Sequence, residues 1–257
     1  MIRFLRFTEW NALRNIEHLQ LPSQHIRINS RYQLAMPSTY LVFGATGGTG
    51  KHFVTQALKA GHHVRALVRS SSKLEGLIGS AKASTNLRIV EGNIGDVKPQ
   101  EMDGLVRGSD FVVCMLGEKE VQKTTKICAK FVKERLVPSM RRCDFKGRFL
   151  YQAGGLTCPP GENLSWILWT IRNTVARSFI GQHEDNEAVM EFLHKECGEL
   201  EWMVHLAGIG GDGETKGRLE KSRAKFSIGN HRDCADYSHR VLEDDQAVRG
   251  WWFSRYV

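Results

Sequence analysis

The sequence predicts an α/β protein built on a doubly wound parallel sheet. Short apolar runs alternate with helix-like segments from residue 40 onward, a pattern that favours parallel strands covered by helices. The first run, YLVF at 40–43, is followed at once by the glycine-rich stretch GATGGTG at 44–50. The chain has 257 residues and 41% hydrophobic content, so it is long enough to bury one large core.

The elements of this sheet are expected in a regular order. Strands are expected at 40–43, 63–68, 87–92, 110–116, 148–153, 199–206 and 251–256. Helices are expected at 49–60, about 120–135, about 185–196 and around 232–243. One domain then covers residues 37–257, and residues 1–36 form an N-terminal extension.

The glycine-rich stretch lies where a strand turns into a helix. Gly44, Gly47 and Gly50 have the spacing GxxGxxG. In such a unit one glycine permits a tight turn, the next lets the backbone approach a pyrophosphate, and the last allows close packing of helix on strand. The helix N-terminus then directs free N–H groups at the anion. We interpret the stretch as a dinucleotide-binding loop, and His52 after Lys51 excludes a P-loop.

The end of the second strand indicates which dinucleotide is bound. A carboxylate at this place accepts hydrogen bonds from the ribose of NAD, whereas a cation pairs with the extra phosphate of NADP. The sequence reads VRSSSK from Val68 to Lys73 and contains no acid there. Arg69 and Lys73, with Ser70 between them, therefore predict a 2′-phosphate clamp and NADP(H). The alternative is a solvated helix start that the serines cap.

The stretch VFGATGGTGKHFVTQALKAGHHVRALVRSSSKL at 42–74 resembles the opening of atypical short-chain dehydrogenase/reductase proteins. The resemblance is to the NmrA-like and biliverdin reductase B (flavin reductase) type, with similarity also to fungal averufin-oxidase-like proteins. Weaker patterns such as EGNIGD at 91–96 and MLG at 115–117 extend it over residues 37–257. It implies a Rossmann domain that binds NADP(H), with a small C-terminal substrate lobe formed mainly by 155–185 and 207–230. Many such proteins transfer hydride to a planar or aromatic substrate, and others bind the nucleotide as sensors.

Several positions are expected to bind the cofactor. They follow from the glycine loop, from the end of the second strand, and from the strand exits that the resemblance covers. The expected cofactor-binding residues are Gly44, Thr46, Gly47, Gly48, Thr49, Gly50, Arg69, Ser70, Lys73, Asn93 and Gly117.

The proton donors of the standard short-chain enzymes are missing. These enzymes use a Tyr-x-x-x-Lys pair for proton transfer to a carbonyl oxygen, but no tyrosine of this chain has lysine four residues later. The usual serine after the fifth strand is replaced by Gly154 and Gly155. Two interpretations stay open. One is hydride transfer to a flavin or quinone-like ring with a proton from water, and the other is a sensor that has lost its chemistry.

Three residues are candidate catalytic groups near the expected nicotinamide. Tyr151 and Gln152 lie at the exit of the fifth strand, and His183 belongs to the polar cluster QHED at 182–185. Thr157 lies just beyond the strand. Packing of Tyr151 in the core, and a capping role for the cluster, are the alternative interpretations.

The segment NLSWILWTIRNTVARSFI at 163–180 offers apolar and aromatic side chains. Proteins of the resembled family build a wall or lid of the substrate pocket at this place. We therefore expect a small aromatic or polyketide-like substrate. A buried helix is the alternative.

Composition limits the remaining possibilities. The formal charge of +8 is scattered over the chain without interleaved aromatics, so no nucleic-acid partner is expected. Six cysteines without a CxxC pair predict neither a metal site nor a disulfide framework. No stretch approaches the roughly 18 apolar residues of a membrane span. We expect a cytoplasmic monomer or weak homodimer, or an organellar protein if residues 1–35, with five arginines and two glutamates, are a transit segment.

Overall fold

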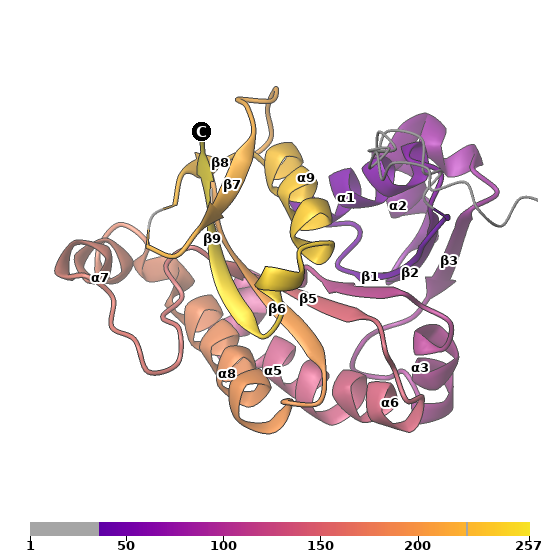
Figure 1. Ribbon diagram of the computed structural model, residues 1–257, viewed down its shortest axis with the longest axis horizontal. Coiled ribbons are helices and arrows are strands. Elements are labelled where there is room, and N and C mark those ends of the chain that lie inside the picture. Colours follow the sequence, from indigo (N-terminus) through magenta and orange to yellow (C-terminus); the bar gives the residue numbers. More distant parts are fainter. Residues whose placement is uncertain (1–35, 225) are drawn as a thin grey trace, which may run out of the picture. The chain divides into compact units, whose positions relative to one another are not determined.

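A mainly parallel sheet forms the centre of the fold (Figure 1). The computed structural model describes residues 36–224 and 226–257. In this part of the chain the sheet has nine strands in the order β3-β2-β1-β4-β5-β6-β9-β7, with β8 paired to β6. The strands are β1 Thr39–Phe43, β2 His63–Val68, β3 Leu87–Glu91, β4 Phe111–Cys114, β5 Arg148–Gly154, β6 Glu201–Ile209, β7 Leu219–Ser222, β8 Ile228–Gly229 and β9 Gly250–Tyr256. Only β7 runs antiparallel to its neighbour among these strands.

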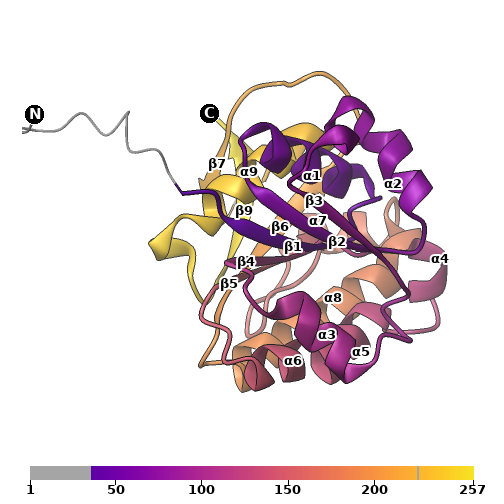
Figure 2. The same ribbon diagram turned by 90° about the vertical axis from the view of Figure 1, so that its right-hand side faces the viewer.

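Helices cover both faces of the sheet. Figures 1 and 2 show α1, α2 and α9 on one face and α3, α5, α6 and α8 on the other. The helices are α1 Gly48–Lys59, α2 Ser71–Ile78, α3 Pro99–Val106, α4 Lys119–Gln122, α5 Ile127–Phe131, α6 Val137–Arg142, α7 Trp166–Asn173, α8 Ile180–Glu196 and α9 His231–Leu242. Short 3-10 turns lie at η1 Gly79–Ala83, η3 Arg177–Phe179 and η4 Asp245–Ala247, and a π-helical turn, η2 Val132–Leu136, joins α5 to α6. The doubly wound sheet that the sequence predicts is confirmed.

Strand β1 shows why its sequence is apolar throughout. Successive side chains of a strand point to opposite faces. Tyr40 and Val42 belong to the core beneath α1 and α9, whereas Leu41 and Phe43 belong to the core beneath α3, α5 and α8. Because both faces are buried, the strand reads as a continuous apolar run rather than an alternating one.

The helix expected at about 120–135 is broken into pieces. It consists of α4, a turn at 123–126, α5, η2 and α6, which ends at Arg142. The break has a physical cause in the fully buried carboxylate of Asp185. Asp185 accepts hydrogen bonds from the backbone N–H groups of Cys128 (2.9 Å) and Ala129 (2.8 Å), and from Gln122 Nε2 (2.8 Å). It thus caps the start of α5 from a different helix.

Two other expectations need correction. The helix expected to begin at about residue 185 begins at Ile180, so the polar cluster 182–185 lies within the first two turns of α8. The segment 207–230, for which no strand is expected after 206, contains the end of β6 and the strands β7 and β8. His205 on β6 is a fully buried core residue whose ring nitrogens both pair with serine hydroxyls, of Ser238 (3.1 Å) and Ser254 (2.9 Å).

The six cysteines are free thiols. Among the described residues, no helix combines the length and the apolar character needed to cross a membrane. The predicted extension, residues 1–36, lies outside the described residues except for Met36.

Replacing Asp185 tests the cap of α5. Asp185→Ala leaves three donors without their shared acceptor, and we expect a loss of roughly 3 kcal/mol in the free energy of unfolding. Urea unfolding measures this loss. The matched control is Glu191→Ala on the same helix, whose carboxylate only pairs with the exposed Lys195 (2.5 Å) and whose removal changes stability by less than about 0.5 kcal/mol. Equal effects of the two substitutions would contradict the capping role.

Candidate functional site

The candidate site lies where the direction of strand connection reverses. β1 has β2 on one side and β4 on the other, so the loops after β1 and β4 part at this point. Ligands of open α/β sheets bind in the crevice outside the carboxyl ends of the strands at such a switch point. The glycine-rich stretch occupies the loop after β1.

The turn after β1 admits only glycine at two positions. Gly44 has φ of 80°, and a Cβ atom there would lie 2.4 Å from the carbonyl oxygen of Met115, next to β4. A Cβ on Gly50 would lie 2.1 Å from the carbonyl oxygen of Gly44. The turn is closed by a hydrogen bond from the N–H of Gly47 to that same oxygen (2.9 Å). The main chain is therefore tightly packed in this turn, and α1 begins at Gly48, five residues after the last residue of β1.

Helix α1 begins without a cap. Gly47 is its N-cap residue, no side chain accepts a hydrogen bond from its first turn, and that turn has no acidic residue. Its first N–H groups and the positive end of its dipole are therefore left for an anion. Thr46 is half-buried and Gly47 is exposed at the entrance of this turn. These features fit a pyrophosphate.

A polar cluster that the sequence did not predict adjoins this turn. His231, the first residue of α9, lies against Gly48, where a Cβ would come within 2.3 Å of the imidazole ring. Its Nδ1 pairs with Thr49 Oγ1 (3.0 Å), which also accepts a hydrogen bond from Gln152 Nε2 (3.2 Å). Burial lowers the pKa of His231, so neutral imidazole is favoured. The Oε1 atom of Gln152 is buried without a partner among the described residues.

The loop after β6 is tied to the start of α1. Asp212 pairs with Lys51, and its other oxygen lies 2.8 Å from His52 Nε2. The hydrogen bonds from Lys51 and His52 lower the pKa of Asp212 to about 2. The N–H of His231 donates to the carbonyl oxygen of Gly211 (3.0 Å). These contacts bring the loop 210–218 alongside the glycine-rich turn.

The predicted phosphate clamp has an acidic neighbour. Arg69, after β2, forms an ion pair with Glu118, after β4, at 3.2 Å between Nη1 and Oε2. The arginine side chain is 70% exposed. Ser70 caps α2 by accepting a hydrogen bond from the N–H of Lys73 (3.3 Å), so the alternative role of the serines is present in the structure. Arg69 and Lys73 are both exposed near the strand exit.

The two remaining predicted cofactor residues lie at neighbouring strand exits. Asn93, after β3, accepts a hydrogen bond from the N–H of Gly95 through its Oδ1 (3.1 Å) and so shapes its own turn. Gly117, after β4, lies beneath the side chain of Gln182, whose Nε2 would be 2.7 Å from a Cβ at that position. Both positions belong to the carboxyl edge of the sheet.

Two of the predicted catalytic residues, Gln152 and Tyr151, face opposite sides of the sheet. Gln152 points toward α1, as described above. Tyr151 is fully buried on the opposite face, and its hydroxyl donates to Asn186 Oδ1 (2.6 Å). Burial raises the pKa of Tyr151 well above its usual range. The packing of Tyr151 gives it a structural role, and its predicted catalytic role stays a prediction.

His183 lies at the exit of β5. The residue is 6% exposed, and its ring is 3.1 Å from the position of a Cβ on Gly154. Its Nδ1 pairs with the hydroxyl of Thr157 (3.3 Å). Burial and, to a smaller extent, the charge of Arg172 lower the pKa of His183 to about 4, against an opposing effect of Glu187. The imidazole is therefore neutral at physiological pH.

Helix α7 presents an apolar surface to solvent. Trp166 (77% exposed), Ile167 (52%) and Trp169 (59%) project into solvent, so the interpretation as a buried helix is wrong. Arg172 of the same helix pairs with Glu187 of α8, with 3.1 Å between Nη2 and Oε2. Figure 1 shows α7 outside the helical layers, near the start of α8.

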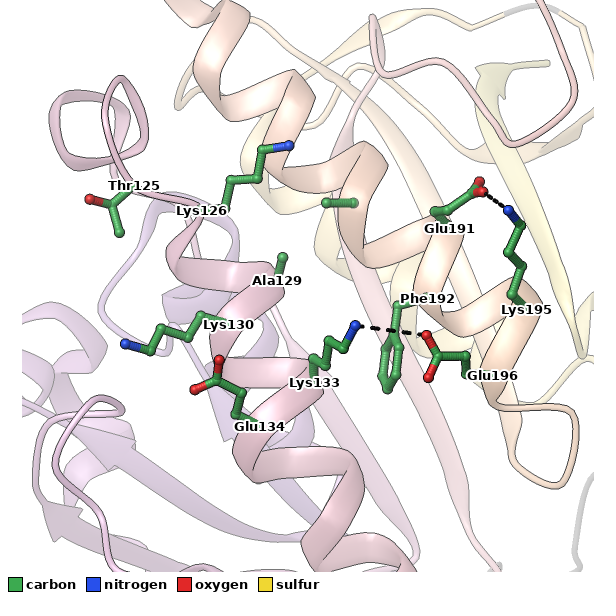
Figure 3. Close-up of a pocket in the computed structure, with 11 residues that line it drawn as sticks. Thr125, Lys126, Ala129, Lys130, Lys133, Glu134, Glu191, Phe192, Lys195 and Glu196 are labelled. Atoms are coloured by element: carbon green, nitrogen blue, oxygen red, sulfur yellow. Dashed lines mark ion pairs between the residues drawn. The ribbon is translucent and has the colours of Figure 1, made fainter.

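A groove of about 560 Å³ lies elsewhere, between α5–η2 and α8 (Figure 3). Lysines and glutamates surround Phe192 there, and Lys133 and Lys195 reach toward Glu196 and Glu191. None of the residues directly after β1, β2, β4 or β5 lines it. We therefore keep this groove apart from the candidate site.

Comparison with known proteins agrees with this location. A family model described as NAD(P)H-binding matches residues 44–154, which include the glycine-rich turn, the exits of β2, β3 and β4, and strand β5 itself. The match supports a nicotinamide dinucleotide as the ligand.

Solved structures share the fold. The oxidoreductase YlbE from Lactococcus lactis superposes with a TM-score of 0.64 at 15% identity, covering 85% of this chain and 91% of that one. ChuY, an anaerobillin reductase from Escherichia coli O157:H7, gives 0.60 at 13% identity, with 85% and 97% covered. Gre2 from Candida albicans gives 0.58 at 16% identity, with 84% and 76% covered. At these identities the similarity establishes the Rossmann-like fold.

A double-mutant cycle tests the contact between the glycine loop and α9. Gly48→Ala drives a methyl group into the imidazole of His231 and is expected to destabilise the protein by about 1–3 kcal/mol. In a His231→Ala background the same substitution no longer meets the imidazole ring, and we expect a much smaller effect because alanine has the better helix propensity. Urea unfolding of the four proteins gives the coupling energy. Additive effects would show that the two residues do not touch.

Proposed function

We propose that this protein is an NADP(H)-dependent oxidoreductase that transfers hydride to or from a small aromatic, flavin-like or quinone-like substrate. The uncapped start of α1 above the compressed glycine turn is the observation that carries the proposal. It offers main-chain donors to a pyrophosphate within the segment that matches the NAD(P)H-binding model. When bound, a reduced nicotinamide would supply the hydride, and the single proton that completes the reduction would come from water.

The preference for NADP(H) rests on charge at the exit of β2. Arg69 and Lys73 are exposed there, and Ser70 adds a hydroxyl. A guanidinium can bind phosphate oxygens through two parallel hydrogen bonds. Glu118 already pairs with Arg69, so the phosphate must compete with this carboxylate.

The substrate class rests on α7. Two tryptophans and an isoleucine are exposed on α7, and Arg172 of this helix contacts the Leu156 carbonyl oxygen just after β5. The nicotinamide of a dinucleotide laid along the strand ends would lie near the exit of β5. Flat apolar molecules stack well on such side chains. One protein of similar fold, ChuY at 13% identity, is an anaerobillin reductase.

Cofactor titration of Arg69→Ala tests the clamp. The variant loses a charge-assisted hydrogen bond to the 2′-phosphate, so NADPH affinity is expected to fall roughly tenfold to a hundredfold while NADH affinity is unchanged. Lys59→Ala, an exposed cation at the far end of α1, is the control and should alter neither. The predicted 2′-phosphate clamp is wrong if Arg69→Ala lowers the affinities for NADPH and NADH equally, or lowers neither.

Glu118→Gln tests the competition. Releasing Arg69 from its surface ion pair is expected to tighten NADPH binding up to about fivefold, because such pairs are worth up to about 1 kcal/mol. The combined Arg69→Ala/Glu118→Gln protein should bind NADPH like Arg69→Ala alone. If Glu118→Gln keeps its effect without the arginine, the carboxylate acts directly on the cofactor.

Steady-state oxidation of NADPH with flavins and a panel of quinones tests the activity. Trp166→Ala and Trp169→Ala are expected to raise the KM for the acceptor about three- to tenfold, because each removes an aromatic contact. Leu77→Ala, an exposed apolar residue of α2, is the matched control. Tight cofactor binding without turnover on any acceptor would instead favour a nucleotide sensor.

A further inference from the structure

A chain of buried side chains connects the core to His183. Tyr151 on β5, Asn186 on α8 and Thr157 after β5 are 0%, 2% and 0% exposed. The Tyr151 hydroxyl donates to Asn186 Oδ1 (2.6 Å), and Asn186 Nδ2 donates to Thr157 Oγ1 (3.4 Å). The Thr157 hydroxyl is also 3.3 Å from His183 Nδ1. The chain thus links four side chains in series.

The direction of these bonds fixes where the imidazole proton lies. Asn186 receives a donor at its oxygen, so its amide nitrogen faces Thr157. Thr157 accepts that bond, and its hydroxyl could accept a second one. Its own proton is buried, however, and the ring of His183 is the one acceptor that it contacts among the described residues. Nδ1 then acts as the acceptor, and a neutral imidazole must carry its proton on Nε2.

The second nitrogen of His183 is free to act on a ligand. His183 Nε2 has no hydrogen-bond partner in residues 36–224 and 226–257. The atom is not fully buried, so a ligand can reach it. The ring lies against Gly154 at the carboxyl end of β5, where any larger residue would crowd it. The nearest charges are Arg172 of α7 and Glu187 of α8, which pair with each other.

We propose that Tyr151, Asn186 and Thr157 are positioning residues that hold His183 in its Nε2–H tautomer, so that this N–H donates a hydrogen bond to a substrate oxygen beside the nicotinamide. The inference rests on the proposed function. A neutral imidazole stabilises charge that develops on a carbonyl or quinone oxygen as hydride arrives, without giving up its own proton. It supplies a polar contact that the missing Tyr-x-x-x-Lys pair would otherwise make, while the proton comes from water.

The low pKa of His183 supports this assignment. Burial lowers the pKa of His183 to about 4, and a histidine is neutral above its pKa, so the ring is uncharged at pH 5–8. In an imidazolium both ring nitrogens carry a proton, so Nδ1 could not accept the hydrogen bond from the Thr157 hydroxyl.

The tautomer can be observed directly by nitrogen NMR of the full chain labelled with ¹⁵N-histidine. We expect the Nε2–H form for His183 from pH 5 to pH 8 in the unaltered protein and in Thr157→Ser. Thr157→Val removes the hydroxyl at nearly constant shape, and a mixture of tautomers is expected. An Nδ1–H form, or a cation at pH 7, in the unaltered protein overturns the proposal whether or not turnover is seen.

Kinetics separate this role from a purely structural one. Thr157→Val is expected to lower kcat about tenfold with the Kd for NADPH unchanged, and Thr157→Ser to restore it. An unchanged kcat in a Thr157→Val protein whose tautomer is mixed overturns the role of His183. An absence of turnover in the unaltered protein contradicts the proposed function, and the NMR result still decides the hydrogen-bond chain.

Discussion

The close approach of main chain to main chain after β1 is the constraint on which the site depends. Gly44 and Gly50 bring the turn to within contact of the Met115 and Gly44 carbonyl oxygens, distances that no side chain would tolerate. This compression starts α1 at Gly48, directly after the strand, and leaves its first N–H groups without a cap. The same turn also sets where Thr49 meets His231 and Gln152. A larger residue in the turn would therefore disturb the anion site and the polar cluster together.

The two sides of the sheet contribute differently to the site. On the side of α1 and α9, polar contacts from α9 and from the loop after β6 close around the glycine turn. On the side of α8, buried side chains organise the exit of β5. Asp185, which precedes Asn186 on α8, accepts a hydrogen bond from the start of α5. The start of α8 therefore combines support of the fold with the histidine for which we propose a contact to substrate.

Local patterns made the sheet and the glycine turn predictable. A buried parallel strand is an apolar run, as YLVF is, and the turn needs glycine at fixed spacing because its geometry is local. The cap of α5 was not predictable, because Asp185 lies 56 and 57 positions from the amides that it binds. His231 lies 182 positions from Thr49, and nothing near it in sequence indicates this contact. Arg69 was found from its place after β2, but its partner Glu118 depends on how the loop after β4 folds back.

The attachment of α7 has a consequence for motion. Its bonds to α8 and to the segment after β5 include the Arg172–Glu187 pair and a long hydrogen bond from Arg172 to the Leu156 carbonyl oxygen (3.5 Å). An attachment of this kind is weak beside the roughly 5–15 kcal/mol that holds a whole domain folded. Because no residue of α7 is buried, we expect the free energy of its local opening to be lower than that of the sheet. The substrate contact that we propose for Trp166 and Trp169 would then depend on this local equilibrium.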